Sequence, residues 1–243
     1  MEDKKKTARD ISLQSGFGSK LENFWFHYKW IVIGVTAALI VLLICVLQTC
    51  STEKNDTVIV YAGPTYLSVS ETEQLRQVMD GLLPADFDGN GKKHAQLSMY
   101  EIYSEEQIRA LAQNQQMGVD KNRNSSEYSN YNTYQQTGAS AIYLLDPWLY
   151  ESMDKAYLCP LSDSVGALPE GALADGYGVR LGDTALYRDN AAVRLLPADT
   201  VICMMVNVYT PFGKPAMDDE EYRNEKDMLR ALVTYIGKET AAE

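Results

Sequence analysis

An uninterrupted apolar stretch at residues 30–47 constrains this chain more than any other feature of its sequence. It contains no charged residue, and as a helix it would be about 27 Å long, close to the roughly 30 Å hydrocarbon core of a bilayer. A core helix would be amphipathic, whereas this stretch is apolar on every side. Aromatic residues precede it, as in an interfacial belt: Phe24, Trp25, Phe26 and Tyr28. The sequence therefore predicts a transmembrane helix at residues 30–48.

The distribution of positive charge predicts the orientation of this helix. Residues 1–29 contain six lysines and arginines, whereas the thirty residues after Cys50 contain two. Because the cytoplasmic flanks of membrane helices are enriched in these residues, residues 1–29 are predicted to be a cytoplasmic tail in the cell membrane. The residues after Cys50 are then extracellular, with a linker at 49–57 and a domain at 58–240. Their surplus of acids produces the net charge of −11 and argues against a nucleic-acid partner.

Two other interpretations of the N-terminal region stay open. A cleaved signal peptide usually has a shorter apolar core, of about 7–15 residues, and a small-residue cleavage site. Residues 47–50, Leu-Gln-Thr-Cys, weakly resemble a bacterial lipobox, which would attach a lipid at Cys50. An uncleaved anchor is favoured, and either kind of anchor would hold the domain at the outer face of the membrane.

The part of the chain after residue 57 alternates between strand and helix patterns. Strands are expected at residues 58–62, 95–103 and 140–145. Each is followed by a helical pattern, at residues 71–83, 104–111 and 148–154. Further on, we expect a hairpin around Gly182-Asp183, a strand at 199–208 and a helix that begins near 218–222. This order predicts an α/β domain with a mainly parallel sheet.

One stretch, residues 113–137, differs from the rest in composition. Asn, Gln, Ser, Thr and Tyr dominate it, so it would bury too little apolar surface to offset the entropy lost on ordering. We therefore expect a mobile polar loop. The alternative is a lid over a ligand, in which Tyr128, Tyr131 and Tyr134 would provide stacking faces.

Several segments of the sequence resemble segments of bacterial extracellular solute-binding proteins, which have the periplasmic-binding-protein-like fold. Val58-Ile59-Val60-Tyr61 resembles their first strand, and residues 140–149 resemble their third strand and the helix after it. Residues 23–30 resemble the approach to single-span anchors of Gram-positive, clostridia-type bacteria. The resemblance implies one reduced solute-binding-protein-like lobe on a single-pass anchor, because about 190 residues after the anchor are too few for two lobes.

The resemblance and the strand order together suggest a ligand site. In open α/β sheets, ligands bind at the carboxyl ends of the strands. The candidate ligand-binding residues follow the first and third predicted strands: Gly63, Tyr66, Asp146 and Trp148. Aromatic rings there would stack on a small molecule or a glycan. If the cleft has been lost, the domain would instead be a protein-interaction module of a membrane complex.

Residues 86–91, Asp-Phe-Asp-Gly-Asn-Gly, match the beginning of a calcium-binding loop. Its oxygen donors would be Asp86, Asp88, Asn90 and the carbonyl of Lys92. The twelfth position holds Leu97 instead of a bidentate Glu, so another segment would have to complete the ligand shell. The alternative is a plain turn between a helix and a strand. Calcium is the one cofactor that the sequence suggests.

Catalytic motifs are not evident in the sequence. After the anchor there is one histidine, His94, and we find no nucleophile motif and no phosphate-binding loop. The domain is therefore predicted to bind and not to catalyse. Cys159 and Cys203 would form a disulfide outside the cell or remain as two buried thiols, and the sequence leaves both options open.

Overall fold

The computed structural model describes residues 17–50, 55–114, 118–169, 171–210 and 213–237, and the chain divides into two compact units, Met1–Lys54 and Asn55–Glu243. In the first unit, helix α2 runs over Phe17–Cys50. Its 22-residue segment Phe24–Cys45 is long and apolar enough to cross a membrane, and none of it is buried. A signal sequence has the same properties, so α2 fits either a membrane anchor or a signal sequence. Residues 1–16 of the predicted tail lie outside the described residues.

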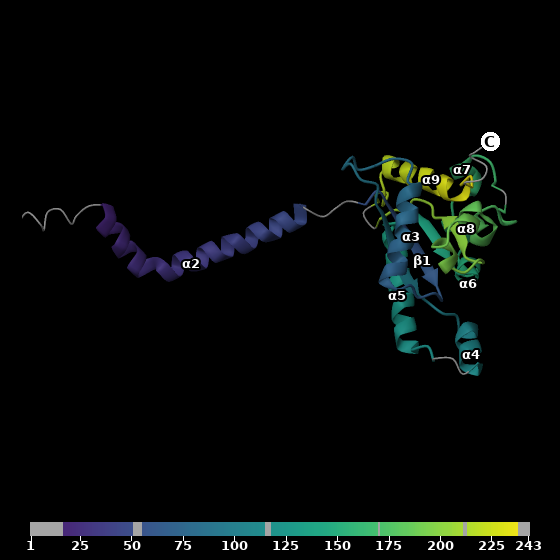
Figure 1. The fold of residues 1–243 in the computed structure, drawn as a ribbon, viewed down its shortest axis with the longest axis horizontal. Helices are drawn as coiled ribbons and strands as arrows, with labels where there is room; N and C mark the ends of the chain where they lie inside the picture. The colour runs from purple at the N-terminus through teal and green to yellow at the C-terminus, as the bar shows by residue number, and fades with distance from the viewer. Residues whose placement is uncertain (1–16, 51–54, 115–117, 170, 211–212, 238–243) are drawn as a thin grey trace, which may run out of the picture. The chain divides into compact units, whose positions relative to one another are not determined.

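A mixed sheet forms the centre of the Asn55–Glu243 unit (Figure 1). It has five strands in the order β2-β1-β3-β5-β4. Its strands are β1 (Thr57–Gly63), β2 (Ala95–Glu101), β3 (Ile142–Leu145), β4 (Gly178–Arg180) and β5 (Val201–Met204). Strand β1 is parallel to β2 and β3, whereas β5 is antiparallel to both β3 and β4. The prediction of an α/β domain is confirmed, with a sheet that is parallel over β1–β3 and mixed beyond them.

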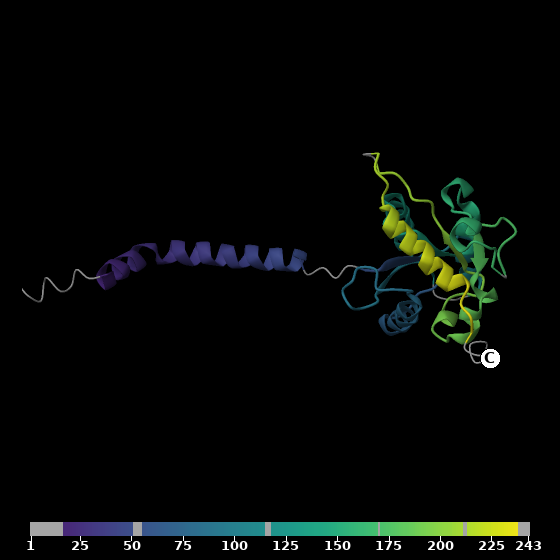
Figure 2. The ribbon, with the colours of Figure 1, turned by 90° about the horizontal axis from the view of Figure 1, so that it is seen from above.

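Both faces of the sheet are covered by helices (Figures 1 and 2). Ile59 and Tyr61 of β1 point into one core, which also contains residues of α3 (Val69–Leu82) and α9 (Asp219–Val233). Val60 and Ala62 point into the opposite core, beneath α5 (Lys121–Thr137) and α6 (Pro147–Ser152). Since successive side chains of a strand alternate between faces, the continuous apolar runs in β1 and β3 require cover on both sides.

Short helices and turns complete the unit. They are α4 (Glu105–Gln113), α7 (Leu161–Val165), α8 (Ala185–Asp189) and the 3-10 turns η1 (Lys155–Tyr157), η2 (Leu181–Asp183) and η3 (Val193–Leu195). The prediction of a hairpin around Gly182-Asp183 is wrong, because β4 pairs with β5 and residues 185–189 form helix α8. Thr184 directs this outcome: its hydroxyl accepts a hydrogen bond from the Tyr187 N–H (3.2 Å) and caps α8.

Helix α3 begins earlier than the sequence pattern suggested. Its N-cap is Ser68, and Glu71 closes a capping box by accepting a hydrogen bond from the Ser68 N–H (2.8 Å). The sequence contains two overlapping Ser-x-x-Glu patterns, and the structure uses the first. Glu73, from the second pattern, forms an ion pair with Arg76.

The prediction of a mobile polar loop at residues 113–137 is wrong for residues 121–137, because these form helix α5. Asp120 caps the helix at one end, and Gly138 ends it in the left-handed conformation (φ 64°). A Cβ at Gly138 would also lie 2.5 Å from Val208, so a glycine is required there. The tyrosines of this stretch, three residues apart, supply one aromatic face: Tyr131 packs on Tyr100 and Tyr143 with ring centroids 5.9 and 6.3 Å away.

The cysteines of this unit are free thiols. Cys159 lies in the core beneath α3 and α9, whereas Cys203 lies in the core on the opposite face of the sheet. Because the sheet separates their side chains, a disulfide between them would require the strands to be rebuilt.

A buried carboxyl group joins α9 to the beginning of β1. Glu225 is 6% exposed, and its Oε2 accepts a hydrogen bond from the Thr57 hydroxyl (2.9 Å). Burial raises the pKa of Glu225 to about 7, although hydrogen bonds from Thr57 and Val58 oppose this rise. Glu221, on the same helix, adds a like charge that raises the pKa further.

This raised pKa predicts a pH-dependent stability. The contribution of protonated Glu225 is complete below its ordinary pKa of 4.5 and is lost as the pH rises to about 7. Glu225→Gln stays neutral, so at pH 8 it should unfold with a free energy up to about 3 kcal/mol above that of the wild type. At pH 4.5 the two proteins should be nearly equal. Urea unfolding of the full chain measures both, with the exposed Glu220→Gln as the control, and parallel pH profiles would contradict the prediction.

Candidate functional site

The carboxyl ends of the parallel strands meet at one edge of the sheet. Strand β1 ends at Gly63 between the ends of β2 and β3: the Ile102 N–H donates to the Gly63 carbonyl (2.9 Å) and the Asp146 N–H to the Ala62 carbonyl (2.8 Å). The chain therefore passes from β2 across β1 to β3, which creates a topological switch point beside β1. Open α/β sheets bind ligands at such points.

Gly63 and Asp146, two of the four predicted ligand residues, are brought together at this edge. A Cβ on Gly63 would lie 2.6 Å from the Tyr61 hydroxyl oxygen and 3.3 Å from the Cβ of Asp146. A larger residue would force these side chains apart, so Gly63 permits the close approach of β1 and β3. Its function here is to let the strand ends pack.

Asp146 is mostly buried, and its carboxylate has two partners. Oδ1 accepts a hydrogen bond from the Trp148 N–H (3.1 Å) and caps α6, and Oδ2 accepts one from Gln107 Nε2 (3.0 Å). Burial raises the pKa of Asp146, and the nearby Asp199 and Glu151 act in the same direction. The carboxylate therefore links α4 and α6 at this edge of the sheet, and both of its oxygens already have hydrogen-bond partners.

Gln107 is a residue that the sequence analysis missed. Its Oε1 accepts a hydrogen bond from the Ser104 N–H (2.7 Å), which closes the capping box of α4, while its Nε2 bonds Asp146. Helix α4 contains no buried residue, and it lies beyond the end of the sheet in Figure 1. Gln107 thus fastens α4 to the end of β3.

Trp148 lines a cavity of about 630 Å³ between α4, α5 and the end of β2, which we call the Trp148 groove. The Trp148 and Tyr128 rings stack on each other in its wall, with centroids 6.2 Å apart and an interplanar angle of 25°. Its polar side chains include Glu105 and Arg109 of α4. An aromatic pair beside charged and amide groups can hold a small solute that has one apolar face.

Tyr66, the remaining predicted residue, is not among the residues that line the Trp148 groove. Its side chain is 67% exposed in the connection between β1 and α3. Its contact with a ligand therefore stays a prediction.

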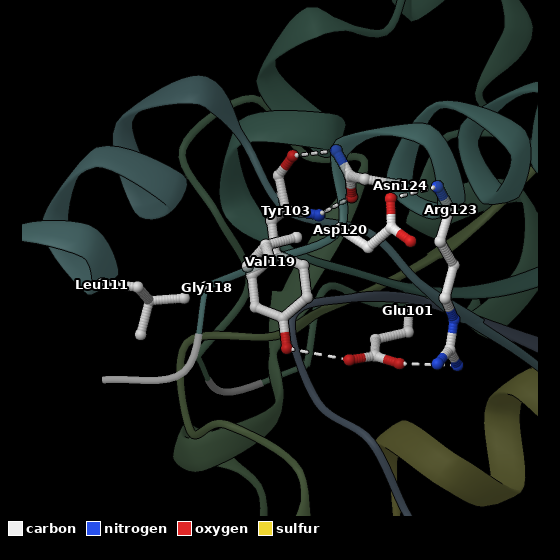
Figure 3. Close-up of a pocket in the computed structure, with 8 residues that line it drawn as sticks. All are labelled: Glu101, Tyr103, Leu111, Gly118, Val119, Asp120, Arg123 and Asn124. Carbon is white, nitrogen blue, oxygen red and sulfur yellow. Dashed lines mark hydrogen bonds and ion pairs between the residues drawn. The ribbon is translucent and has the colours of Figure 1, made fainter. Parts of the chain in front are cut away.

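A second cavity, of about 410 Å³, lies between α4 and the beginning of α5 (Figure 3). Tyr103 donates to Glu101 (3.0 Å), which also pairs with Arg123 (3.0 Å), and the Asn124 side chain makes two hydrogen bonds with the Tyr103 main chain (2.8 and 3.0 Å). Burial and the charge of Glu101 raise the pKa of Tyr103 to about 12, so its hydroxyl stays a donor.

A third cavity, of about 380 Å³, lies on the other side of Trp148, beside the end of β4. Lys155 Nζ lies 3.4 Å from the ring centroid of Tyr150 and 3.3 Å from Asp175 Oδ2. The Tyr150 hydroxyl donates to the same carboxylate (2.8 Å). Burial and the Asp175 charge raise the pKa of Tyr150 well above its usual range, so it stays protonated.

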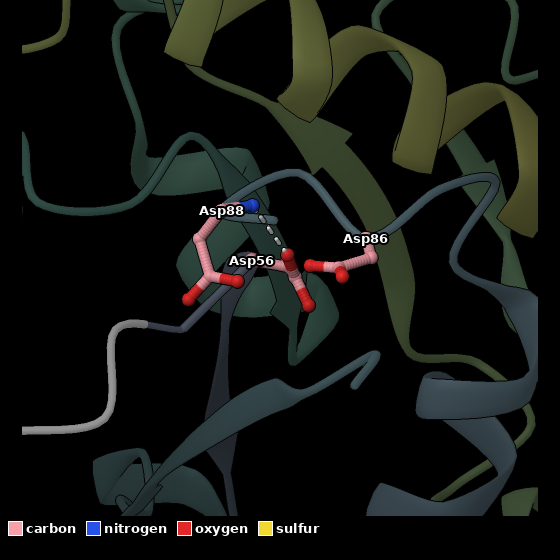
Figure 4. A group of neighbouring side chains, drawn as sticks. All are labelled: Asp56, Asp86 and Asp88. Carbon is pink, nitrogen blue, oxygen red and sulfur yellow. Dashed lines mark hydrogen bonds between the residues drawn. The ribbon is translucent and has the colours of Figure 1, made fainter. Parts of the chain in front are cut away.

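The predicted calcium loop lies at the opposite end of β1. Carboxylate oxygens of Asp86 and Asp88 lie within 4.8 Å of each other and of an oxygen of Asp56, which precedes β1 (Figure 4). Asp56 adds a third carboxylate from another segment, as a calcium site without the twelfth-position Glu would require, and no motif marks it in the sequence. The cluster consists of carboxylates alone, so the contributions of Asn90 and of the Lys92 carbonyl stay predictions; Asn90 Oδ1 accepts a hydrogen bond from the Lys92 N–H (2.8 Å).

The same carboxylates already accept main-chain hydrogen bonds. Asp86 accepts from the N–H groups of Gly89 (2.9 Å) and Gly91 (2.6 Å), and Asp56 accepts from those of Phe87 (2.6 Å) and His94 (2.7 Å). These bonds would hold the turn without a cation. A calcium site and a plain acidic turn therefore both fit the geometry.

A calcium site predicts a metal-dependent melting temperature. Calcium at 100 times its dissociation constant would add about 2.7 kcal/mol, which corresponds to roughly 5–10 °C for a domain of this size. Asp88→Asn should abolish the shift between calcium and chelator, whereas the control Asp219→Asn, on the exposed first turn of α9, should keep it. An unchanged melt at millimolar calcium would leave the loop as a plain turn.

Comparisons with known proteins do not assign the chain to a family. No family model matches it, and no curated protein or solved structure matches it either. The resemblance to extracellular solute-binding proteins therefore stays a prediction from the sequence. The edge of the sheet with its Trp148 groove is the feature on which a function can be proposed.

Proposed function

We propose that the chain is a single-pass membrane protein whose Asn55–Glu243 unit lies outside the cell and binds a small polar solute or glycan in the Trp148 groove. In this proposal the unit is a reduced solute-binding-protein-like lobe and carries out no catalytic step. The observation that carries it is that a cavity of about 630 Å³, the Tyr128–Trp148 pair and the switch point of the sheet occur at the same place.

Features of the first unit support the membrane part of the proposal. The segment Phe24–Cys45 has the length and composition of a spanning helix, and the lysines and arginines gather before it. With this orientation, the Trp148 groove would be accessible to solutes outside the cell.

A second candidate function is a protein-interaction module of a membrane complex. It is favoured by two apolar side chains near the same edge of the sheet, Tyr66 and Val69, which are 67% and 87% exposed. Neighbouring apolar side chains in solvent are typical of a surface that a protein partner covers. A ligand in the groove and a partner on this surface are distinguished by the experiment that follows.

Trp148 provides a direct optical test, because the chain has three tryptophans and the other two, Trp25 and Trp30, lie in α2. In the full chain carrying Trp25→Phe and Trp30→Phe, a ligand in the groove should change the fluorescence of Trp148 in a saturable way. The panel would contain monosaccharides, amino acids and short peptides.

For a ligand found in this way, Trp148→Ala and Tyr128→Ala should each weaken binding at least tenfold by calorimetry, about 1.4 kcal/mol. Tyr209→Ala removes an exposed aromatic ring outside the groove and should have no effect. If no panel member binds while Tyr66→Asp and Val69→Asp abolish the co-purification of a membrane partner, the interaction module replaces the solute site.

The orientation predicts the pattern of thiol labelling in intact cells. In a Cys50→Ser background, a reagent that cannot cross membranes should label Ser126→Cys on the exposed side of α5 and spare Ser12→Cys. Both cysteines should be found on a polypeptide of the same mass, since an uncleaved anchor keeps residue 12 on the mature chain. Labelling at position 12, or its absence from the mature chain, would contradict the proposed topology.

A further inference from the structure

The three cavities at the carboxyl edge of the sheet adjoin one another. Tyr103 and Asn124 line both the cavity of Figure 3 and the Trp148 groove. On the other side, the third cavity shares no lining residue with the groove, but Pro147, which lines it, directly precedes Trp148, which lines the groove. The three hollows therefore form one row, which we call the edge trough.

The edge trough crosses the ends of the whole sheet. Its first cavity includes Glu101 at the end of β2, and its third includes Arg180 at the end of β4, which are the two outermost strands. Five strands about 4.8 Å apart span roughly 19 Å. A single small solute would fill one hollow, whereas a chain molecule would fill the row.

We propose that the edge trough binds a neutral glycan chain of several sugar units, with its central unit on Trp148. Aromatic rings stand in each part of the row: Tyr103 in the first, Tyr128 and Trp148 in the second, and Tyr150 in the third. The rings of Tyr103, Tyr128 and Trp148 can face the apolar side of a sugar, and carboxylate, amide and guanidinium groups beside them can bond the hydroxyls. The Tyr150 ring is buried beneath Lys155, so the third cavity would hold a sugar through its polar side chains. This proposal rests on the proposed function of the Trp148 groove.

The charges along the trough favour a neutral ligand. Each cavity contains both signs: Glu101 with Arg123 in the first, Glu105 with Arg109 in the second, and Asp175 with Lys155 in the third. The carboxylates would repel a polyanion, and the guanidinium and ammonium groups would repel a polycation. The three linings together have seven carboxylates and five basic groups, so both signs are present along the whole row and a neutral chain has the fewest repulsive contacts.

The location of the trough favours a glycan over an extended peptide. Extended peptides commonly bind by adding a strand to an open sheet edge, where main-chain groups form a ladder. The trough lies across the strand ends, and side chains supply the polar groups named above. Because a chain molecule can occupy neighbouring hollows at once, affinity should rise steeply with the number of linked units.

The test is a length series measured on the full chain in detergent. β-1,4-linked glucose and β-1,4-linked N-acetylglucosamine, each with one, two, four and six units, are titrated against Trp148 fluorescence in the Trp25→Phe, Trp30→Phe protein. One series should bind at least tenfold more tightly as the hexamer than as the dimer. Arg123→Gln and Arg180→Gln, in the outer cavities, should each weaken hexamer binding threefold or more and leave dimer binding unchanged.

Arg188→Gln is the matched control, since Arg188 lies on α8 and lines none of the three cavities. Equal affinities for all lengths would overturn the glycan chain and leave a single-solute groove intact. Tighter binding of an extended hexapeptide than of any sugar would overturn it in favour of a peptide site. If no sugar, amino acid or peptide binds, the proposed function fails together with this inference.

Discussion

The burial of β1 and β3 on both faces is the constraint on which the rest of this unit depends. Every side chain from Ile59 to Ala62 and from Ile142 to Leu145 is buried, so neither face of the sheet centre can meet water. Helices must therefore cover both faces, and the polar connections are confined to the ends of the strands. The candidate site lies where these connections gather, because a cavity lined by side chains from several elements can form there.

Asp146 and Gln107 fix the positions of the connections at the strand ends and thereby shape the candidate site. The buried Asp146 carboxylate receives hydrogen bonds from Trp148, on one side, and from Gln107, on the other. Helix α4 buries no residue of its own, so this link is a main support for the wall that it provides. The opposite wall depends on α5, whose tyrosines anchor an otherwise polar helix to the sheet. Loss of the Gln107 link would open the Trp148 groove without disturbing the central strands, whereas loss of the α5 tyrosines would also uncover one face of the sheet.

The two ends of β1 use carboxyl groups in different ways. At the amino end, Asp56 fastens the 86–94 turn through main-chain hydrogen bonds, and Glu225 joins α9 to Thr57. At the carboxyl end, Asp146 arranges groups around a cavity. Burial raises the pKa of both Glu225 and Asp146, because a low-dielectric surrounding disfavours the charged form. A rise in pH thus weakens the attachment of α9 at the end of β1 remote from the groove.

Local patterns in the sequence determined the apolar helix, the three parallel strands and the acidic turn, because length, hydrophobicity and period are properties of neighbouring residues. They also marked Gly63, Asp146 and Trp148 as residues at strand ends. Tertiary structure decided the rest: that Asp56 joins Asp86 and Asp88, that Gln107 bonds Asp146, and that Tyr128 stacks over Trp148. Helix α5 belongs to this second group, since its composition is that of a loop and only the aromatic surface of the sheet gives its tyrosines a partner. Contacts between segments far apart in the chain have no local pattern, and they exist only once the sheet has set the distance between them.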